Sequence, residues 1–182
     1  MTRKRITVII AAIALLIAGT ASYATFAVKP AVAPPTQATA PYVPTKYEVG
    51  PPDAQELLEL VNAERVRAGV GSLAVKETLA QSAQWKADDM ASRNYFAHTD
   101  PETGKKNGLD YFFSIDDNCR NVSENIRWIP FETATSQTVF NGWYQSASHV
   151  TAIRNGNYSL TGLAVAKGDT GYYAVEHFCT TR

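Results

Sequence analysis

The order of the secondary-structure patterns predicts an α+β protein, because helical periodicity comes first and strand-like runs close the chain. Three segments have apolar residues at helical spacing. Two runs, 160–167 and 172–179, have the composition of strands, and the Gly-Asp-Thr-Gly sequence at 168–171 is typical of a hairpin turn between them. The chain has 182 residues, of which 45% are apolar, so it is neither disordered nor collagen-like and has room for one domain plus a smaller segment.

The distribution of charge argues against a nucleic-acid partner. The chain has 17 basic and 17 acidic side chains, but four of the basic ones lie within the first 29 residues. Residues 30–182 therefore have 13 basic and 17 acidic side chains, a net charge of about −4. Because nucleic-acid affinity depends largely on Lys and Arg side chains that neutralise phosphates, we expect no DNA or RNA binding.

Residues 1–28 are predicted to be a signal peptide or an N-terminal membrane anchor. Arg3, Lys4 and Arg5 form a positively charged start, and residues 6–28 carry no charge. The uncharged segment is long enough to be transmembrane, while the small residues near its end are typical of a signal-peptidase site. In both cases the basic residues stay in the cytoplasm. The rest of the protein is therefore expected to be secreted, and so extracellular, or anchored at the outer face of the cytoplasmic membrane.

Residues 29–52 are predicted to be an extended linker. Seven of the nine prolines lie in these 24 residues, together with Ala, Thr and Val. Such a composition cannot bury a core and favours polyproline-like stretches. The folded domain is therefore expected to cover residues 53–182, which are enough for a sizeable core.

Three helices are expected in this domain. The first has Asp53 as N-cap and Glu56 three positions later, which is a capping box, and Gly69 supplies the left-handed stop. The second covers about residues 76–92, and its apolar side chains are small enough to pack closely. The third covers about residues 133–146.

The two cysteines, Cys119 and Cys179, are both in the part expected outside the cytoplasm. An even count in an oxidising compartment favours a disulfide over two buried free thiols. Closing a loop of this length would stabilise the fold by about 4 kcal/mol in the chain-entropy model. A catalytic thiol is not expected, because neither cysteine lies in a recognisable nucleophile motif.

The candidate site residues follow the predicted helices. His98 comes directly after the second helix and His149 directly after the third, and Glu124 is a lone carboxylate between them. Loop residues at helix ends that face a common groove commonly converge on ligands. His177 alternates with Val175 in a strand-like run and is expected to be a packed or rim residue.

At these residues the chain resembles the CAP superfamily of cysteine-rich secretory, antigen 5 and pathogenesis-related proteins, and in particular its bacterial SCP-like branch. The resemblance covers the opening helix at 57–65, the first-histidine loop at 94–101, the Ser-Glu-Asn-Ile segment at 123–126, the Trp-to-His segment at 143–149 and the closing aromatic strand at 172–178. It implies a three-layer α-β-α sandwich with a central antiparallel sheet.

The resemblance also implies a central cleft in which two histidines and two acidic residues meet. By motif, the histidines are His98 and His149 and one acid is Glu124, whereas Ser146 stands where the family has the second acid. Two imidazoles and a carboxylate could hold a divalent metal such as zinc with one position open to water. Loss of the second acid removes a ligand or a general base, which weakens a hydrolytic mechanism.

Three hypotheses about function stay open, and the sequence does not decide whether the protein is an enzyme. The resemblance favours a binding or interaction module for a lipid, sterol or cell-envelope ligand. The alternatives are a metal-dependent hydrolase acting on peptide or cell-envelope polymer, and a structural domain in which His98 and Glu124 merely tie a loop to the sheet. A triad through Ser148 and His149 is disfavoured, because sequence neighbours generally point apart.

Overall fold

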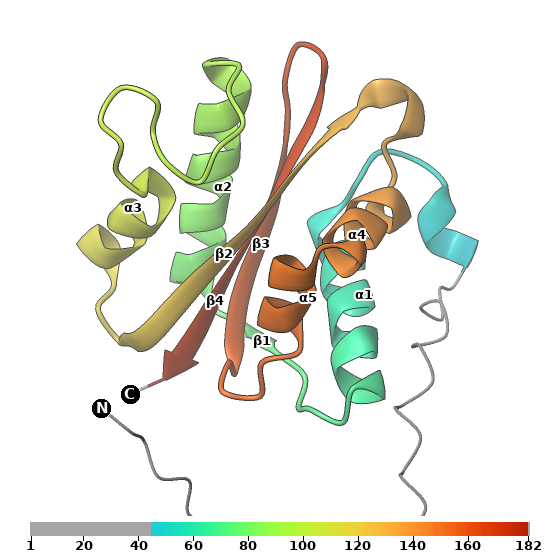
Figure 1. Cartoon of the computed structure of the whole chain (residues 1–182), viewed down its shortest axis with the longest axis vertical. Coiled ribbons are helices and arrows are strands. Elements are labelled where there is room, and N and C mark those ends of the chain that lie inside the picture. The colour runs from blue at the N-terminus through green and yellow to red at the C-terminus, as the bar shows by residue number, and fades with distance from the viewer. Residues whose placement is uncertain (1–44, 182) are drawn as a thin grey trace, which may run out of the picture. The chain divides into compact units, whose positions relative to one another are not determined.

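A four-stranded sheet lies between two layers of helices in the structure, a computed structural model in which residues 45–181 are described (Figure 1). The strand order is β1-β3-β4-β2. Strands β2 (Cys119–Pro130), β4 (Gly171–Thr181) and β3 (Leu160–Lys167) pair in antiparallel fashion, and the two-residue β1 (Ala74–Val75) is parallel to β3. The predicted α+β class and the three-layer α-β-α sandwich are confirmed.

The helices divide between the two faces of the sheet (Figure 1). One layer consists of α2 (Glu77–Ser92) and α3 (Asn107–Ile115). The other layer consists of α1 (Ala54–Arg67), α4 (Ser136–Gln145) and α5 (Ala147–Ile153). The predicted signal or anchor at 1–28 and most of the predicted linker lie outside the described residues. Within the described part, no helix combines the length and the apolar character that crossing a membrane requires.

Helix α1 begins and ends where the sequence predicts, but its N-terminal cap includes a residue of α4. The Asp53 side chain accepts hydrogen bonds from the backbone N–H groups of Gln55 and Glu56, at 2.8 and 3.0 Å. The Ser136 hydroxyl accepts from the Asp53 N–H at 2.9 Å and donates to the Glu56 carboxylate at 2.7 Å. The expected capping box is therefore closed through Ser136. At the other end, Gly69 has φ +76° and ends the helix.

Helix α2 packs tightly on the sheet, as its small apolar residues predict. Ala83 and Ala87 are fully buried between the helix and the sheet. A Cβ atom added to Gly162 of β3 would lie 2.1 Å from backbone atoms of Leu79 and Ala80. Only glycine leaves room for this approach.

The larger core lies on the other face, between the sheet and helices α1, α4 and α5. Its largest members, Trp143 and Phe140, come from α4 and are at most 1% exposed. Tyr47, in a 3-10 helix at Thr45–Glu48, belongs to the same core with 4% exposure. The packed region therefore extends upstream of residue 53, into the segment assigned to the linker from its composition.

Three elements do not match the helices and strands expected from periodicity. Residues 102–122, where periodicity predicts no helix or strand, contain α3 and the start of β2. Helix α3 has nine residues, too few for a clear helical period. The polar residues of β2 give no strand pattern in the sequence. This segment is a strand because it pairs with β4 along its length. The third helix is also shorter than expected, because Thr135 caps α4 and α5 follows as a separate helix.

The predicted disulfide between Cys119 and Cys179 is confirmed, with a Cα–Cα distance of 5.6 Å. It joins the start of β2 to the end of β4. Leu79 of α2 and Phe112 of α3 pack against it with no exposure. The bond therefore holds one end of the sheet against the α2/α3 layer.

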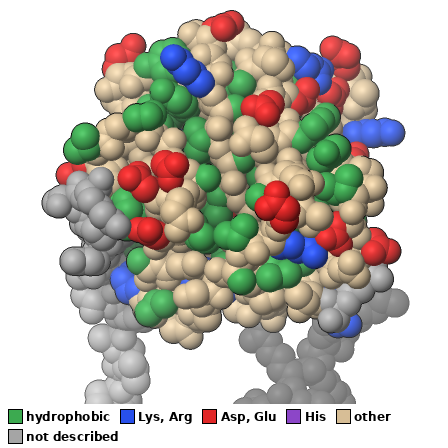
Figure 2. Space-filling model, turned by 180° about the vertical axis from the view of Figure 1, so that it is seen from behind, with side chains coloured by type: hydrophobic (Ala, Val, Ile, Leu, Met, Phe, Trp, Pro, Cys, Tyr) green, Lys and Arg blue, Asp and Glu red, His purple; other side chains and the backbone are tan. Residues whose placement is uncertain are grey.

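The face opposite to the view of Figure 1 shows acidic and basic side chains interspersed with hydrophobic ones (Figure 2). Neither sign of charge forms a continuous area on this face. Both signs are expected there, because residues 30–182 have 13 basic and 17 acidic side chains.

Candidate functional site

Glu124, on strand β2, connects two histidines through its two carboxylate oxygens. Its side chain is only 6% exposed. Oε1 accepts a hydrogen bond from His98 Nδ1 at 2.8 Å, and Oε2 accepts one from His177 Nε2 at 2.9 Å. Burial raises the pKa of the Glu124 carboxyl, but the hydrogen bonds from His177 and His98 outweigh it and lower the pKa to about 2. The carboxylate is therefore ionised at neutral pH.

His177 is the site residue that the sequence did not identify. It is fully buried on β4, directly opposite Glu124 in the strand register. Its Nδ1 lies 2.7 Å from the Ser82 hydroxyl of α2, which also lies 2.9 Å from the Leu79 carbonyl. Its role could have been found only from the pairing of β2 with β4, because directly opposite residues on paired strands share a face of the sheet.

The arrangement Ser82, His177 and Glu124 has the composition of a nucleophile, a base and an acid, but it cannot act on a substrate. Ser82 and His177 are both completely buried. These contacts therefore orient the Glu124 carboxylate from the buried side of the site.

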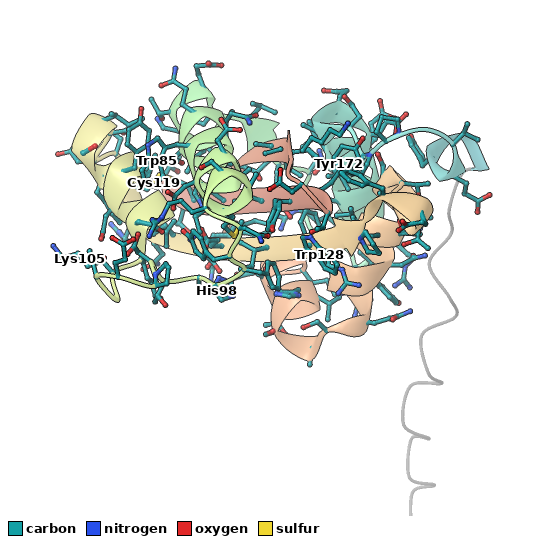
Figure 3. All side chains as sticks on the ribbon, turned by 90° about the horizontal axis from the view of Figure 1, so that it is seen from above. Trp85, His98, Lys105, Cys119, Trp128 and Tyr172 are labelled. Carbon is teal, nitrogen blue, oxygen red and sulfur yellow. A yellow bond between two sulfur atoms is a disulfide. The ribbon has the colours of Figure 1, made fainter. Side chains whose placement is uncertain are left out.

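His98 is the accessible end of this hydrogen-bond chain. It lies beside β2 on the loop that follows α2 (Figure 3), and its side chain is 49% exposed. Its Nδ1 is engaged by Glu124, and its Nε2 has no partner among residues 45–181. A neutral His98 that donates through Nδ1 presents an unprotonated Nε2, which can accept a hydrogen bond, a proton or a metal ion.

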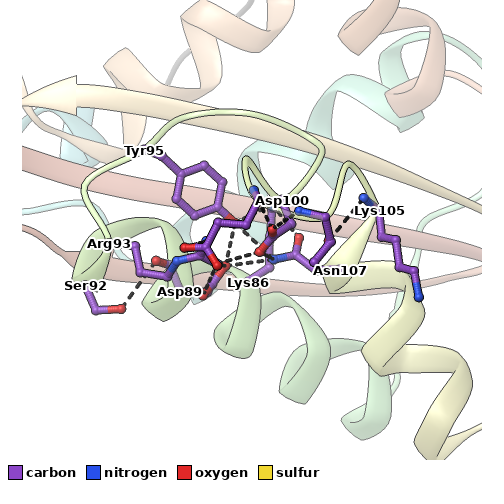
Figure 4. Close-up of polar contacts among 10 residues, drawn as sticks. Lys86, Asp89, Ser92, Arg93, Tyr95, Asp100, Lys105 and Asn107 are labelled. Atoms are coloured by element: carbon purple, nitrogen blue, oxygen red, sulfur yellow. Dashed lines mark hydrogen bonds and ion pairs between the residues drawn. The ribbon is translucent and has the colours of Figure 1, made fainter.

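A polar network holds the His98 loop against the end of α2 (Figure 4). The Lys86 ammonium is fully buried and donates to the Tyr95 hydroxyl at 3.0 Å and to Asn107 Oδ1 at 2.8 Å. Arg93, at the end of α2, pairs with Asp100 at 2.5 Å. Burial lowers the pKa of Lys86, against the opposing effect of nearby carboxylates. The loop is therefore fastened on both sides of His98.

A cavity of about 270 Å³ opens beside His98 and Glu124. Two apolar side chains and four polar ones line it: His98, Lys106, Leu109, Val122, Ser123 and Glu124. Ligand cavities commonly measure about 300 to 1,000 Å³. This cavity therefore suits one group of a ligand better than a complete large molecule.

His149 and Ser146 are not part of this lining. His149 Nδ1 is buried without a hydrogen-bond partner in the described part of the chain. Its pKa is lowered by burial and further by the charges of His98 and Arg127. Ser146, where α4 ends and α5 begins, lies 3.1 Å from the Ser148 hydroxyl. The structure thus joins His98 to Glu124 directly and brings His149 only within electrostatic range of His98.

The donor set for a metal is smaller than the expected two imidazoles and one carboxylate. Within residues 45–181, no three His, Cys, Asp or Glu side chains are arranged to hold a metal ion. Both oxygens of Glu124 accept hydrogen bonds from imidazoles, so this carboxylate orients His98 and is not free to be a ligand. The predicted ligands that remain, His98 and His149, would need water or other donors to complete a zinc site.

Comparison with known proteins identifies relatives along most of the described region. The model of the CAP, or cysteine-rich secretory protein, family matches residues 58–181. The uncharacterised protein YkwD of Bacillus subtilis is 33% identical over 136 residues, which are 74% of this chain and 49% of YkwD. The uncharacterised membrane protein YlbC of the same organism is 27% identical over 65% of this chain and 32% of its own length. The chain thus spans half or less of these relatives.

Solved structures share the arrangement of the sheet and helices. An extracellular protein with an SCP domain from Bacillus anthracis is 25% identical, with a TM-score of 0.57 over 70% of this chain and 40% of that protein. An outer surface protein of Borrelia burgdorferi has a TM-score of 0.62 over 77% of this chain and 97% of its own, at 19% identity. The second likeness concerns the fold alone.

Proposed function

The chain belongs to the cysteine-rich secretory protein (CAP) family, and from this premise we propose that it is an extracytoplasmic ligand-binding module. Its ligand is a lipid, a sterol or another cell-envelope component, one polar group of which enters the cavity beside His98. The observation that carries the proposal is the ionised Glu124, whose two oxygens are held by His98 and His177 at 2.8 and 2.9 Å. A buried, oriented carboxylate of this kind fixes the polar surface that the ligand meets.

Three features support a location outside the cytoplasm. The disulfide between Cys119 and Cys179 is of the kind that persists in oxidising compartments. The sequence of residues 1–28 has the pattern of a signal or anchor. The similar protein from Bacillus anthracis is described as extracellular. We infer that the protein is secreted or held at the outer face of the cytoplasmic membrane.

A hydrolase that acts on peptide or cell-envelope polymer is the second candidate. It is favoured by the unpaired Nε2 of His98, since an imidazole oriented by a carboxylate can act as a general base. A metal-dependent hydrolase is less well supported, because Glu124 already accepts two hydrogen bonds and is not free to bind a metal ion. Binding needs no nucleophile and no metal, so it is the function that the geometry supports better.

The proposal is tested by closing the cavity. Leu109→Trp in α3 would fill the space beside Glu124, and Ile115→Trp adds the same side chain at an exposed position of the same helix. The full chain and both variants would be titrated with muropeptides and with phospholipid vesicles that contain or lack sterol. We expect binding of one of these probes to fall at least tenfold in Leu109→Trp and to stay within twofold in Ile115→Trp.

His98→Gln provides a second test that leaves the volume of the site almost unchanged. It should weaken the same binding, because His98 is the exposed polar group of the cavity wall. Unchanged binding in both Leu109→Trp and His98→Gln would contradict the proposal. Release of cleaved product by the parent chain, lost in His98→Gln, would favour the hydrolase.

A further inference from the structure

Arg127, on strand β2, has a partly buried guanidinium with neither a hydrogen bond nor an ion pair among residues 45–181. Its Nε is buried and without a partner. Four other arginines of the described region are engaged with carbonyl or carboxylate oxygens: Arg65, Arg67, Arg93 and Arg154. Buried donors without partners are rare in folded proteins, and each one calls for a physical explanation.

The backbone of α4 makes room for this guanidinium. A Cβ atom added to Gly142 would lie 2.6 Å from Arg127 Nε and 2.7 Å from its Cζ. Glycine within a helix costs about 1 kcal/mol relative to alanine. Gly142 therefore weakens α4 locally. Its missing side chain leaves the space that the Arg127 guanidinium occupies.

His149 is bonded to β2 two residues before Arg127, and it also has an unpartnered nitrogen. His149 Nδ1 is buried and accepts or donates no hydrogen bond in the described region. Asn125 Nδ2 donates to the His149 carbonyl at 3.3 Å, which ties the start of α5 to β2. The charges of His98 and Arg127 both act on His149. The nitrogen-bearing side chains of His98, Arg127 and His149 are thus all held along β2. The Glu124 carboxylate is not available to Arg127 or His149, because it already accepts from two other imidazole nitrogens.

We propose that Arg127 and His149, with His98 beside them, bind an oxyanion group of the ligand, a carboxylate or a phosphate. The inference rests on the proposed function and adds the chemical class of the group that is recognised. An oxyanion would accept from the terminal N–H groups of the Arg127 guanidinium, because Nε is buried against Gly142. It would also accept from His149 through Nε2–H, because Nδ1 of this ring is buried. A cationic group is disfavoured here, because Arg127 would repel it.

The test uses the full chain, with inorganic phosphate and acetate as separate probes at constant ionic strength. Binding would be followed by NMR through the side-chain Nε–Hε resonances of the arginines. We expect a saturable shift of the Arg127 resonance with at least one anion. Arg127→Gln should weaken binding at least tenfold. Arg120→Gln, which removes the same charge from an exposed position of the same strand, should change it less than twofold.

Gly142→Ala tests the same geometry without removing a charge. It would displace the guanidinium and should also weaken anion binding tenfold, so it serves if Arg127→Gln does not fold. Tighter binding of phosphate than of acetate would assign a phosphate group, and the reverse a carboxylate. Two results would overturn the inference. One is an equal loss of anion affinity in Arg127→Gln and Arg120→Gln, and the other is the absence of a saturable shift of the Arg127 resonance with both anions.

The two proposals can fail separately. Leu109→Trp acts on the cavity beside Glu124 and leaves Arg127 in place. If the envelope probes do not bind but phosphate shifts Arg127, the anion site stands and the proposed function falls. If the envelope probes bind with equal affinity to the parent and to Arg127→Gln, the anion site falls and the proposed function stands.

Discussion

At the scale of single residues, the two buried glutamates of the sheet show how hydrogen-bond donors decide the charge of a carboxyl group. Glu124 receives two imidazole N–H donors and is ionised. Glu176 is fully buried, and its described donor is the Thr161 hydroxyl at 3.2 Å. Burial raises the pKa of Glu176 to about 8, although Thr161 and the charge of Arg65 oppose this. Glu176 is therefore largely protonated at neutral pH.

This state of Glu176 predicts a pH-dependent stability. The folded-state pKa of about 8 lies above the ordinary value of 4.5, so the folded chain holds a proton that the unfolded chain has lost. The free energy of unfolding should fall by about 1.4 kcal/mol per pH unit as the pH rises from 4.5 towards 8. Glu176→Gln should remove this slope, and the exposed Glu132→Gln should retain it. Urea unfolding at pH 5, 6.5 and 8 measures the difference, and parallel profiles for the parent and Glu176→Gln would refute it.

At the scale of elements, strand β2 divides its side chains between the two helical layers. Ile126 packs with the α2 side of the sheet, and Ile129 belongs to the core on the α1/α4 side. In the same alternation, Glu124 joins His177, while Asn125 bonds the start of α5. Because β2 is the edge strand, groups from both layers can approach it. This position brings the His98 loop and His149 within electrostatic range.

The packing of α2 on the sheet predicts a strong effect of one methyl group. Gly162→Ala would place its Cβ 2.1 Å from the backbone of Leu79 and Ala80, so helix and strand must separate. We expect a loss of about 3 kcal/mol, at the upper end of overpacking costs. Gly156→Ala, whose Cβ would meet Val70 at 3.5 Å, should cost much less. Denaturant unfolding of both variants compares them, and equal midpoints would show that the contact relaxes without cost.

How far the sequence predicts these elements depends on where their stabilisation comes from. Helix α2 and the β3–β4 hairpin have clear periodicity and turn signals, and they form as expected. Strand β2 contains Ser123, Glu124 and Asn125 and is stabilised by pairing with a strand far along the chain. No local pattern shows such pairing. For the same reason His98 and Glu124 could be proposed from motifs, whereas the role of His177 required the three-dimensional register.

At the scale of the whole molecule, the disulfide closes a large part of the chain into a loop. Cys119 and Cys179 are separated by 60 residues, so the bond closes nearly half of the unfolded domain into a loop. Replacing both cysteines by alanine should lower the free energy of unfolding by about 4 kcal/mol in the chain-entropy model. A reductant should lower the stability of the parent by a similar amount and leave the double variant unchanged. A parent whose unfolding midpoint is insensitive to reductant would contradict this expectation.

The hydrogen bonds between Ser136 of α4 and the cap of α1 have a consequence for how the domain opens. Asp53, Glu56 and Ser136 form one hydrogen-bonded group across two helices that are 80 residues apart in the sequence. Fraying of the first turn of either helix breaks the two hydrogen bonds that Ser136 makes to Asp53 and Glu56. We therefore expect the beginnings of both helices to unfold locally as one cooperative unit, so that their amide protons exchange with solvent in a common opening event.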